Sequence, residues 1–316
     1  RIEVLAQEEV PFCTVISTWG PHFPHTVPRR YAEMYADATA KGFMPDNYSL
    51  PVWADDAGEV SETNKPKMQS RPFWPCQNTV PLTSEDWRRT AAHYWGFCTY
   101  LDEQFGRVLD KLDELGIADR TVIAFAVDHG EMLGAHGFFD KGPYFYDEIM
   151  HIPLIVRDPL ERAPRNPEGL VSLRDLFPTL IALAGADAVL NDDERGRSIW
   201  DRDEDAVFYT YDAYQGRQFK LRGIRTARCK YNWSPHDLDE LYDLKLDPQE
   251  RHNLIDDAGY TGVLDRLRRR LTAWMAEEGD YLRCAEHVPP VGSYVDGRGF
   301  DEQHDPGWSE IGRAHV

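Results

Sequence analysis

Residues 121–142 read TVIAFAVDHGEMLGAHGFFDKG, and this stretch decides the fold class of the 316-residue chain. Its first seven residues, 121–127, carry no charge and predict a strand that is buried on both faces. Asp128 and His129 follow at the carboxyl end of that strand, where open α/β sheets bind their ligands. A loop rich in Gly and His then leads to Lys141. The stretch therefore predicts an α/β fold with a functional site at this strand end.

Asp128 and His129 are candidate ligands of a metal ion. Neighbouring side chains of a strand point to opposite faces, so both can reach one ion only if the chain bends, which Gly130 permits. A carboxylate beside an imidazole suits a divalent cation. The alternative is a strand-to-helix turn in which Asp128 is the N-cap. His136 and Lys141 in the same loop favour the site, because a cationic side chain beside a metal ion suits an anionic substrate.

His22 is a third candidate, in an earlier part of the chain. Residues 11–18, PFCTVIST, predict a strand, and the loop after it contains Pro21 and Pro24. The residue before each proline is restricted to extended backbone, so His22 is displayed on a stiff loop at a strand end. The alternative is a surface loop whose histidine has no role.

The composition narrows the class of partner. A formal net charge of -19 argues against nucleic acid, which requires a basic face. It does not exclude a small anionic substrate, because a local cluster of Lys, His and metal can dominate the field of a cleft. The sequence contains no run of about 18 apolar residues, so no transmembrane helix is predicted. The five cysteines are scattered and show neither a disulfide framework nor paired metal spacing.

The order of predicted elements indicates three parts. Apolar residues at helical spacing predict a long helix from about residue 84 to Gly116, directly before the strand at 121–127, which is an α/β arrangement. Short strands and then a helix follow from about residue 207. We therefore expect the C-terminal part of a larger α/β domain at 1–204, a small C-terminal α+β subdomain at 205–285, and an irregular tail at 286–316.

Several motifs, in this order and spacing, make the chain resemble the type I sulfatases of the alkaline phosphatase superfamily. The resemblance runs from about residue 11 to residue 282. The motifs are Pro21-His22-Phe23-Pro24, Asp128-His129-Gly130, Lys141-Gly142, Asp175-Leu176-Phe177-Pro178, Glu240-Leu241-Tyr242-Asp243, and Asp247, Glu250 and Asn253. The resemblance implies an alkaline-phosphatase-like sandwich with a mostly parallel central sheet, of which this chain holds a part.

The resemblance also implies roles for single residues. Asp128 and His129 match two ligands of a divalent cation, usually Ca²⁺, with Mg²⁺ or Mn²⁺ as alternatives; coordination chemistry alone does not choose calcium. Lys141 matches the lysine that contacts the sulfate group and the ester oxygen. His22 matches the histidine beside the leaving group. His136 is expected to have a structural or supporting role.

One essential part of the family's site has no counterpart in residues 1–316. The nucleophile of these enzymes is a formylglycine made from the Cys or Ser of a Cys/Ser-x-Pro-Ser-Arg segment, and Cys76 is followed by Gln-Asn-Thr-Val instead. The chain begins at Arg1, and its last six residues, IGRAHV, read as a translated sequencing adapter. We therefore expect an N-terminally truncated fragment with an artefactual end, inactive alone, whose intact form is a sulfatase.

Two other functions stay open on the sequence. A phosphonate monoester hydrolase or phosphodiesterase of the same superfamily would carry the same residues, and a non-catalytic binding protein could keep the fold. Aryl sulfates, sulfated glycans and choline sulfate all remain as substrates. The sequence decides neither the oligomeric state nor between a cytoplasmic and an exported location.

Overall fold

The structure is a computed structural model. It describes residues 1–8, 10–37, 84–136, 138–161, 166–167, 169–186, 198–201, 204–214, 217–235 and 237–282. The predicted irregular tail at 286–316 lies outside these residues, as does Cys76. The short helical turns are α1 (Ile2–Leu5), η3 (Ala118–Arg120), η4 (Leu173–Asp175) and η6 (Ala258–Tyr260).

The predicted long helix is present as α4 (Ser84–Glu114). It ends before Gly116, whose φ of 65° is a conformation that glycine adopts without strain. The short helix α2 (Arg29–Ala32) packs against α4. A Cβ at Gly96 would lie 2.1 Å from the carbonyl oxygen of Tyr31, so the small residue allows the two backbones to approach closely. This contact holds the segment that follows His22 against α4.

Strand β1 (Ile123–Ala126) begins within the predicted range and pairs antiparallel with β2 (Leu154–Arg157). Phe105 of α4 packs edge-on against Phe125 with ring centroids 5.1 Å apart. Ala124 is nevertheless exposed, so the expectation that β1 is buried on both faces is wrong for the described residues. Every strand pairing that the structure describes is antiparallel, so the mostly parallel central sheet is not seen in this part of the chain.

The predicted strand at 11–18 is also absent. These residues are assigned to no strand, and Val15 is 87% exposed. A strand requires a neighbouring backbone to accept and donate its hydrogen bonds, and no described segment pairs with residues 11–18. The β-branched residues give this segment a propensity for extended backbone, but a strand forms only where a second backbone pairs with it.

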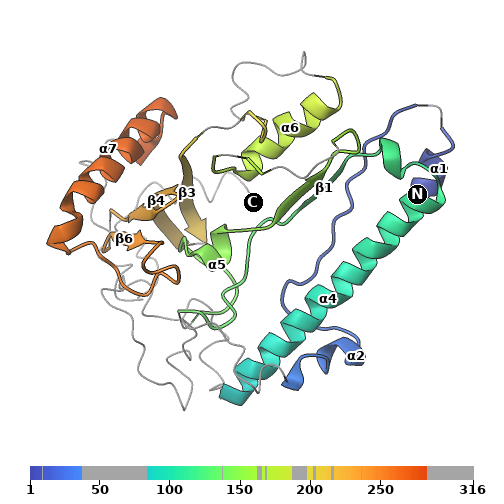
Figure 1. Cartoon of the computed structure of the whole chain (residues 1–316). Coiled ribbons are helices and arrows are strands. Elements are labelled where there is room, and N and C mark those ends of the chain that lie inside the picture. The colour runs from blue at the N-terminus through green and yellow to red at the C-terminus, as the bar shows by residue number, and fades with distance from the viewer. Residues whose placement is uncertain are drawn as a thin grey trace, which may run out of the picture.

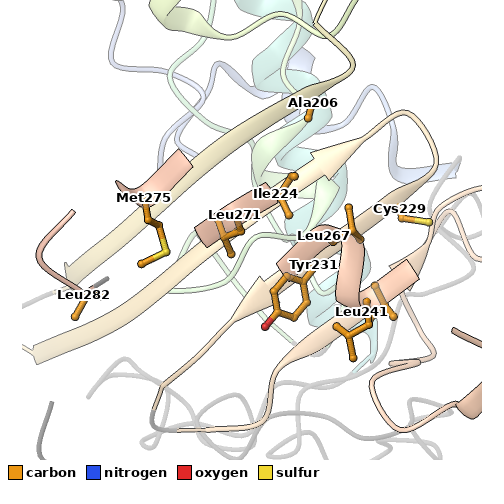
Figure 2. Close-up of a cluster of buried hydrophobic side chains, with 10 residues drawn as sticks. Ala206, Ile224, Cys229, Tyr231, Leu241, Leu267, Leu271, Met275 and Leu282 are labelled. Carbon is orange, nitrogen blue, oxygen red and sulfur yellow. The ribbon is translucent and has the colours of Figure 1, made fainter. Parts of the chain in front are cut away.

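The C-terminal part is a four-stranded antiparallel sheet covered by one helix. Its strands are β3 (Ala206–Tyr214), β4 (Arg217–Thr226), β5 (Cys229–Trp233) and β6 (Glu240–Asp243), in that spatial order. Helix α7 (Thr261–Glu277) turns one face toward the sheet, and Figure 2 shows Leu267, Leu271 and Met275 of α7 beside Ile224 and Tyr231 of the strands. These side chains are almost fully buried and form the main apolar cluster of this part.

Two further helices, α5 and α6, precede the C-terminal sheet in the chain. Helix α6 (Leu176–Leu183) follows a turn in which the Ser172 side chain and Asp175 form a capping box. Helix α5 (Asp147–Met150) is only one turn long. Figure 1 shows α4 and α7 on opposite sides of the molecule, with α5 beside the four-stranded sheet and near the start of the loop that leaves β1. The described part of the chain is a mixed α/β arrangement, and Asp147 of α5 contacts Arg225 of β4 and Lys230 of β5.

Candidate active site

Asp128 and His129 follow β1 and converge where the chain bends. The backbone N–H of Gly130 donates to the carbonyl oxygen of Ile149 at 2.9 Å, and a Cβ at Gly130 would lie 1.8 Å from the carbonyl oxygen of Glu148. Only glycine permits so close an approach of the loop to α5. The bend places Asp128 Oδ2 3.5 Å from His129 Nε2. The bend predicted from Gly130 is present, and it brings the two side chains together.

The His129 ring is oriented to offer a lone pair. Its Nδ1 lies 2.7 Å from the carbonyl oxygen of Gly130, and a carbonyl only accepts hydrogen bonds, so Nδ1 carries the proton. Nε2 is then unprotonated in the neutral ring and faces the Asp128 carboxylate, whose side chain is 88% exposed. Two ligands 3.5 Å apart can share an ion that each contacts at about 2.4 Å. The pair therefore fits a divalent cation.

The pair is not a complete metal site by itself. Among the residues that the structure describes, no group of three or more His, Cys, Asp and Glu side chains could hold a metal ion. Asp128 and His129 would thus supply two ligands, and the exposure of Asp128 leaves room for others.

Lys141 and His22 form a second pair, although 119 positions separate them in the sequence. Lys141 Nζ lies 2.7 Å from His22 Nε2, and His22 Nδ1 lies 2.6 Å from the carbonyl oxygen of Phe23. Nδ1 therefore donates to that carbonyl, and Nε2 accepts from the Lys141 ammonium group. Asp140 Oδ1 lies 3.1 Å from the same ammonium group. We call His22–Lys141 and Asp128–His129 the two site pairs.

The loop that joins the two site pairs is held by a buried carboxylate. Glu131 Oε1 accepts hydrogen bonds from the backbone N–H groups of Leu133 at 3.2 Å and Asp140 at 2.5 Å. Burial raises the pKa of Glu131 to about 7. Leu133, His136 and Asp140 have positive φ values of 45°, 56° and 63°, which non-glycine residues rarely adopt. Such backbone strain persists where the surroundings enforce it, and it is concentrated here beside Lys141.

His136 is the residue of this loop that packs against the start of α5. Its ring stacks on Tyr146 with centroids 3.7 Å apart and an angle of 10° between the planes. Its Nε2 lies 3.8 Å from Glu148 Oε2, and the residue is 2% exposed. These contacts connect the loop to α5 and agree with a supporting role.

Aromatic side chains surround His22. Trp19 lies 4.9 Å from the His22 ring between centroids and is 74% exposed, while Phe23 packs edge-on against Phe139 at 5.2 Å. His25 packs against Tyr94 at 5.3 Å, and burial lowers the pKa of His25 to about 4. His25 is therefore neutral and part of the aromatic packing, while Trp19 is open to a ligand beside His22.

Sequence reasoning did not identify two residues of this region. Asp140 accompanies Lys141, and its place before the Lys-Gly pair was an available signal. Glu131 follows the Asp-His-Gly bend, but nothing in its position indicates that its carboxylate folds inward to accept two amide N–H groups. Such a role depends on how the loop closes.

A family model described as Sulfatase matches residues 2–186, more than half of the chain. The chain belongs to the sulfatase family. A second model, described as the C-terminal part of N-sulphoglucosamine sulphohydrolase, matches residues 134–277. The family that the motifs resembled is thus confirmed.

Curated relatives agree with the assignment. The chain is 32% identical to an uncharacterized sulfatase, YidJ, of Escherichia coli over 88% of its own length and 54% of that protein. It is 30% identical to an arylsulfatase of Clostridium perfringens over 83% of its length and 53% of that protein. The chain spans about half the length of the curated relatives it matches.

Solved structures place the fold in the same group. A Bacteroides fragilis protein described as the sulfatase YidJ superposes with a TM-score of 0.70 at 23% identity, over 89% of this chain and 57% of that one. A complex with the substrate D-glucosamine-2-N,6-O-disulfate gives 0.55 at 29% identity, over 63% and 42%. A phosphonate monoester hydrolase of Agrobacterium radiobacter gives 0.64 at 25% identity, over 87% and 59%. The predicted alkaline-phosphatase-like α/β class is confirmed.

No helix of the described residues is long and apolar enough to cross a membrane.

Proposed function

We propose that this chain belongs to a longer protein that hydrolyses sulfate monoesters at the two site pairs. The observation that carries the proposal is the 2.7 Å contact between Lys141 Nζ and His22 Nε2, at the far end of the loop that begins with Asp128 and His129. Lys141 is a cation at the position where an anionic group would bind. His22 offers a ring nitrogen that can exchange a proton.

Lys141 and His22 would act on different parts of the sulfate ester. The Lys141 ammonium group would neutralise negative charge on the sulfate and on the ester oxygen as the S–O bond breaks. His22 Nε2, when protonated, would donate to the departing alkoxide. Its Nδ1–H donates to the carbonyl oxygen of Phe23 in the neutral and in the cationic ring. A protonated Nε2 can no longer accept from Lys141, so the ammonium group would turn from the ring to the sulfate when His22 carries the second proton.

Asp128 and His129 would supply two ligands of a divalent cation, which we propose to be Ca²⁺. Sulfatases generally depend on a metal ion and on formylglycine. Bound there, the cation would hold and neutralise sulfate oxygens, and the formylglycine hydrate would be the attacking group. The motif for formylglycine does not occur in residues 1–316, so the activity is proposed for the full protein.

We favour a sugar sulfate as the substrate class. A solved structure similar to this chain holds a glucosamine disulfate, and the exposed Trp19 beside His22 offers a flat apolar face of the kind on which a sugar ring can pack. The phosphonate monoester hydrolase among the similar structures supports a second candidate, hydrolysis of phosphonate monoesters.

Parallel assays of the full protein separate these candidates. Turnover of 4-nitrophenyl sulfate and of 4-nitrophenyl phenylphosphonate would be measured with added Ca²⁺ and with a chelator. We expect the sulfate to be the better substrate and the chelator to abolish its turnover. A preference for the phosphonate would establish the second candidate, and turnover of neither would support a binding protein.

A further inference from the structure

Four charged side chains join α5 to the C-terminal sheet. They are Arg225 of β4, Lys230 of β5, Glu250 of the loop after β6, and Asp147, the first residue of α5; we call them the α5 clamp. Glu250 belongs to the Asp247–Asn253 motif that the resemblance included and that the proposed chemistry does not use.

Lys230 is the centre of the clamp. Its side chain is 0% exposed, and its Nζ lies 2.6 Å from Asp147 Oδ1 and 2.6 Å from Glu250 Oε1. The same ammonium group donates to the carbonyl oxygen of Phe145 at 2.7 Å. Arg225 adds two further contacts to the Asp147 carboxylate, at 3.0 and 3.3 Å. Both cations of the clamp therefore contact the Asp147 carboxylate, and Lys230 also contacts the backbone just before α5.

Glu250 holds the start of α5 directly. Its Oε2 accepts the backbone N–H of Asp147 at 2.6 Å. The residue is 2% exposed and has a φ of 53°, a strained conformation for a residue other than glycine. In this backbone conformation the carboxylate contacts both α5 and Lys230.

The α5 backbone is in turn the surface on which the Asp128–His129 bend rests. Ile149 accepts the Gly130 N–H, and Glu148 leaves no room for a side chain at Gly130. A displacement of α5 would therefore move the bend that brings Asp128 Oδ2 to 3.5 Å from His129 Nε2.

The clamp contains two cations and two carboxyl groups, and burial raises the pKa of the Glu250 carboxyl to about 7 although Lys230 opposes that shift. Burial by itself raises the pKa of Asp147, but Lys230 and Arg225 outweigh it and lower that pKa to about 2, so Asp147 is ionised. Buried ion pairs of this kind recover little net free energy of folding once desolvation is included. They do fix geometry, because each charge has only one set of partners at this depth.

We propose that Lys230 and Glu250 are positioning residues, which hold α5 in the place where its backbone sets the geometry of Asp128 and His129. The C-terminal part of the chain would thus determine how well the metal ligands are arranged, without touching the metal or the substrate. The inference rests on the proposed function for the role of Asp128 and His129, but the contact from the clamp to Gly130 can be tested separately.

The test compares Lys230→Met and Glu250→Gln with Arg270→Met in the full protein. Arg270 of α7 forms an ion pair with Asp205 rather than with a residue of α5, so its variant controls for loss of a cation in the same part of the chain. Hydrogen–deuterium exchange would be followed in peptides that contain Gly130, and Ca²⁺ binding would be followed by titration calorimetry.

We expect faster exchange at Gly130 and about 10-fold weaker Ca²⁺ binding in both clamp variants, since loss of groups that orient ligands typically has this effect. The control should match the wild type in both. A lower melting temperature with unchanged exchange at Gly130 would overturn the proposal and leave the clamp a purely structural feature. If Lys230→Met does not fold, Glu250→Gln, which keeps the shape of the side chain, decides alone. Faster exchange at Gly130 in a protein that binds no Ca²⁺ would support the clamp and contradict the proposed function instead.

Discussion

The α5 clamp and the two site pairs contain the same kinds of side chain in opposite states. In the clamp, Lys230 is 0% and Glu250 1% exposed in their side chains, and each cation lies within hydrogen-bond distance of a carboxylate. In the site pairs, the Asp128 side chain is 88% exposed and faces the lone pair of a histidine, while Lys141 donates to a neutral ring.

This difference in exposure indicates a structural role for the clamp and a ligand-binding role for the site pairs. The charges of the clamp contact one another in the interior and are closed to a ligand. Asp128 and His129 keep an exposed carboxylate and a lone pair, and Lys141, although paired with Asp140, keeps a side chain that is 24% exposed. The α5 clamp contacts α5, and the loop that carries Asp128, His129 and Lys141 packs on α5, so this helix connects the clamp to the two site pairs.

The largest expected effect is the loss of the Lys141 charge. Lys141→Ala should lower kcat/KM for 4-nitrophenyl sulfate about 1,000-fold, because removal of one group that stabilises developing charge typically costs that much. The melting temperature should also fall, because the substitution removes the cation that lies 3.1 Å from the Asp140 carboxylate, whose side chain is 5% exposed, so the rates are compared where both proteins are folded. Lys111→Ala, at an ion-paired lysine on α4, is the control and should keep full activity. A Lys141 variant with wild-type kinetics would show that its cation serves no substrate.

His22→Gln should have a smaller effect that depends on the leaving group. A departing alkyl alkoxide needs a proton far more than 4-nitrophenolate does, so we expect about a 100-fold loss with an alkyl sulfate and much less with the aryl ester. Steady-state rates with both esters test this. The exposed His252→Gln is the control. Equal losses for the two esters would contradict proton donation by His22.

His25 gives the smallest effect and concerns stability. Its pKa of about 4 in the folded protein lies below the ordinary value of 6.5, so between these values the unfolded chain binds a proton that the folded chain does not. Stability should therefore fall as the pH decreases from about 6.5 to 4. His25→Phe should reduce that fall, as measured by melting temperatures across this range. An unchanged profile would mean that His25 is solvated like an exposed histidine.

The same contrast explains what the sequence could predict. Helices α4 and α7 followed from local periodicity, and strands β3, β4 and β5 followed in part from short runs of strand-forming residues. The bend at Gly130 followed from the conformational freedom of glycine. The pairing of β1 with β2 and the absence of a strand at 11–18 depend on which backbone lies alongside, which no local pattern records.

The clamp could not be predicted for a related reason. Lys230 lies in an alternating strand pattern, where a lysine is normally assigned to the solvent face, and Asp147 and Glu250 are 103 positions apart. Only the tertiary fold brings these three charges together.

The account depends most on Asp128 as a ligand of a catalytic cation. Turnover of 4-nitrophenyl sulfate by the full protein would be titrated with Ca²⁺ for the wild type and for Asp128→Ala, with Asp113→Ala as a control on α4. The account predicts Ca²⁺-dependent turnover in the wild type and the control, and none in folded Asp128→Ala at any Ca²⁺ concentration. A folded Asp128→Ala protein with wild-type rate and Ca²⁺ dependence would contradict it.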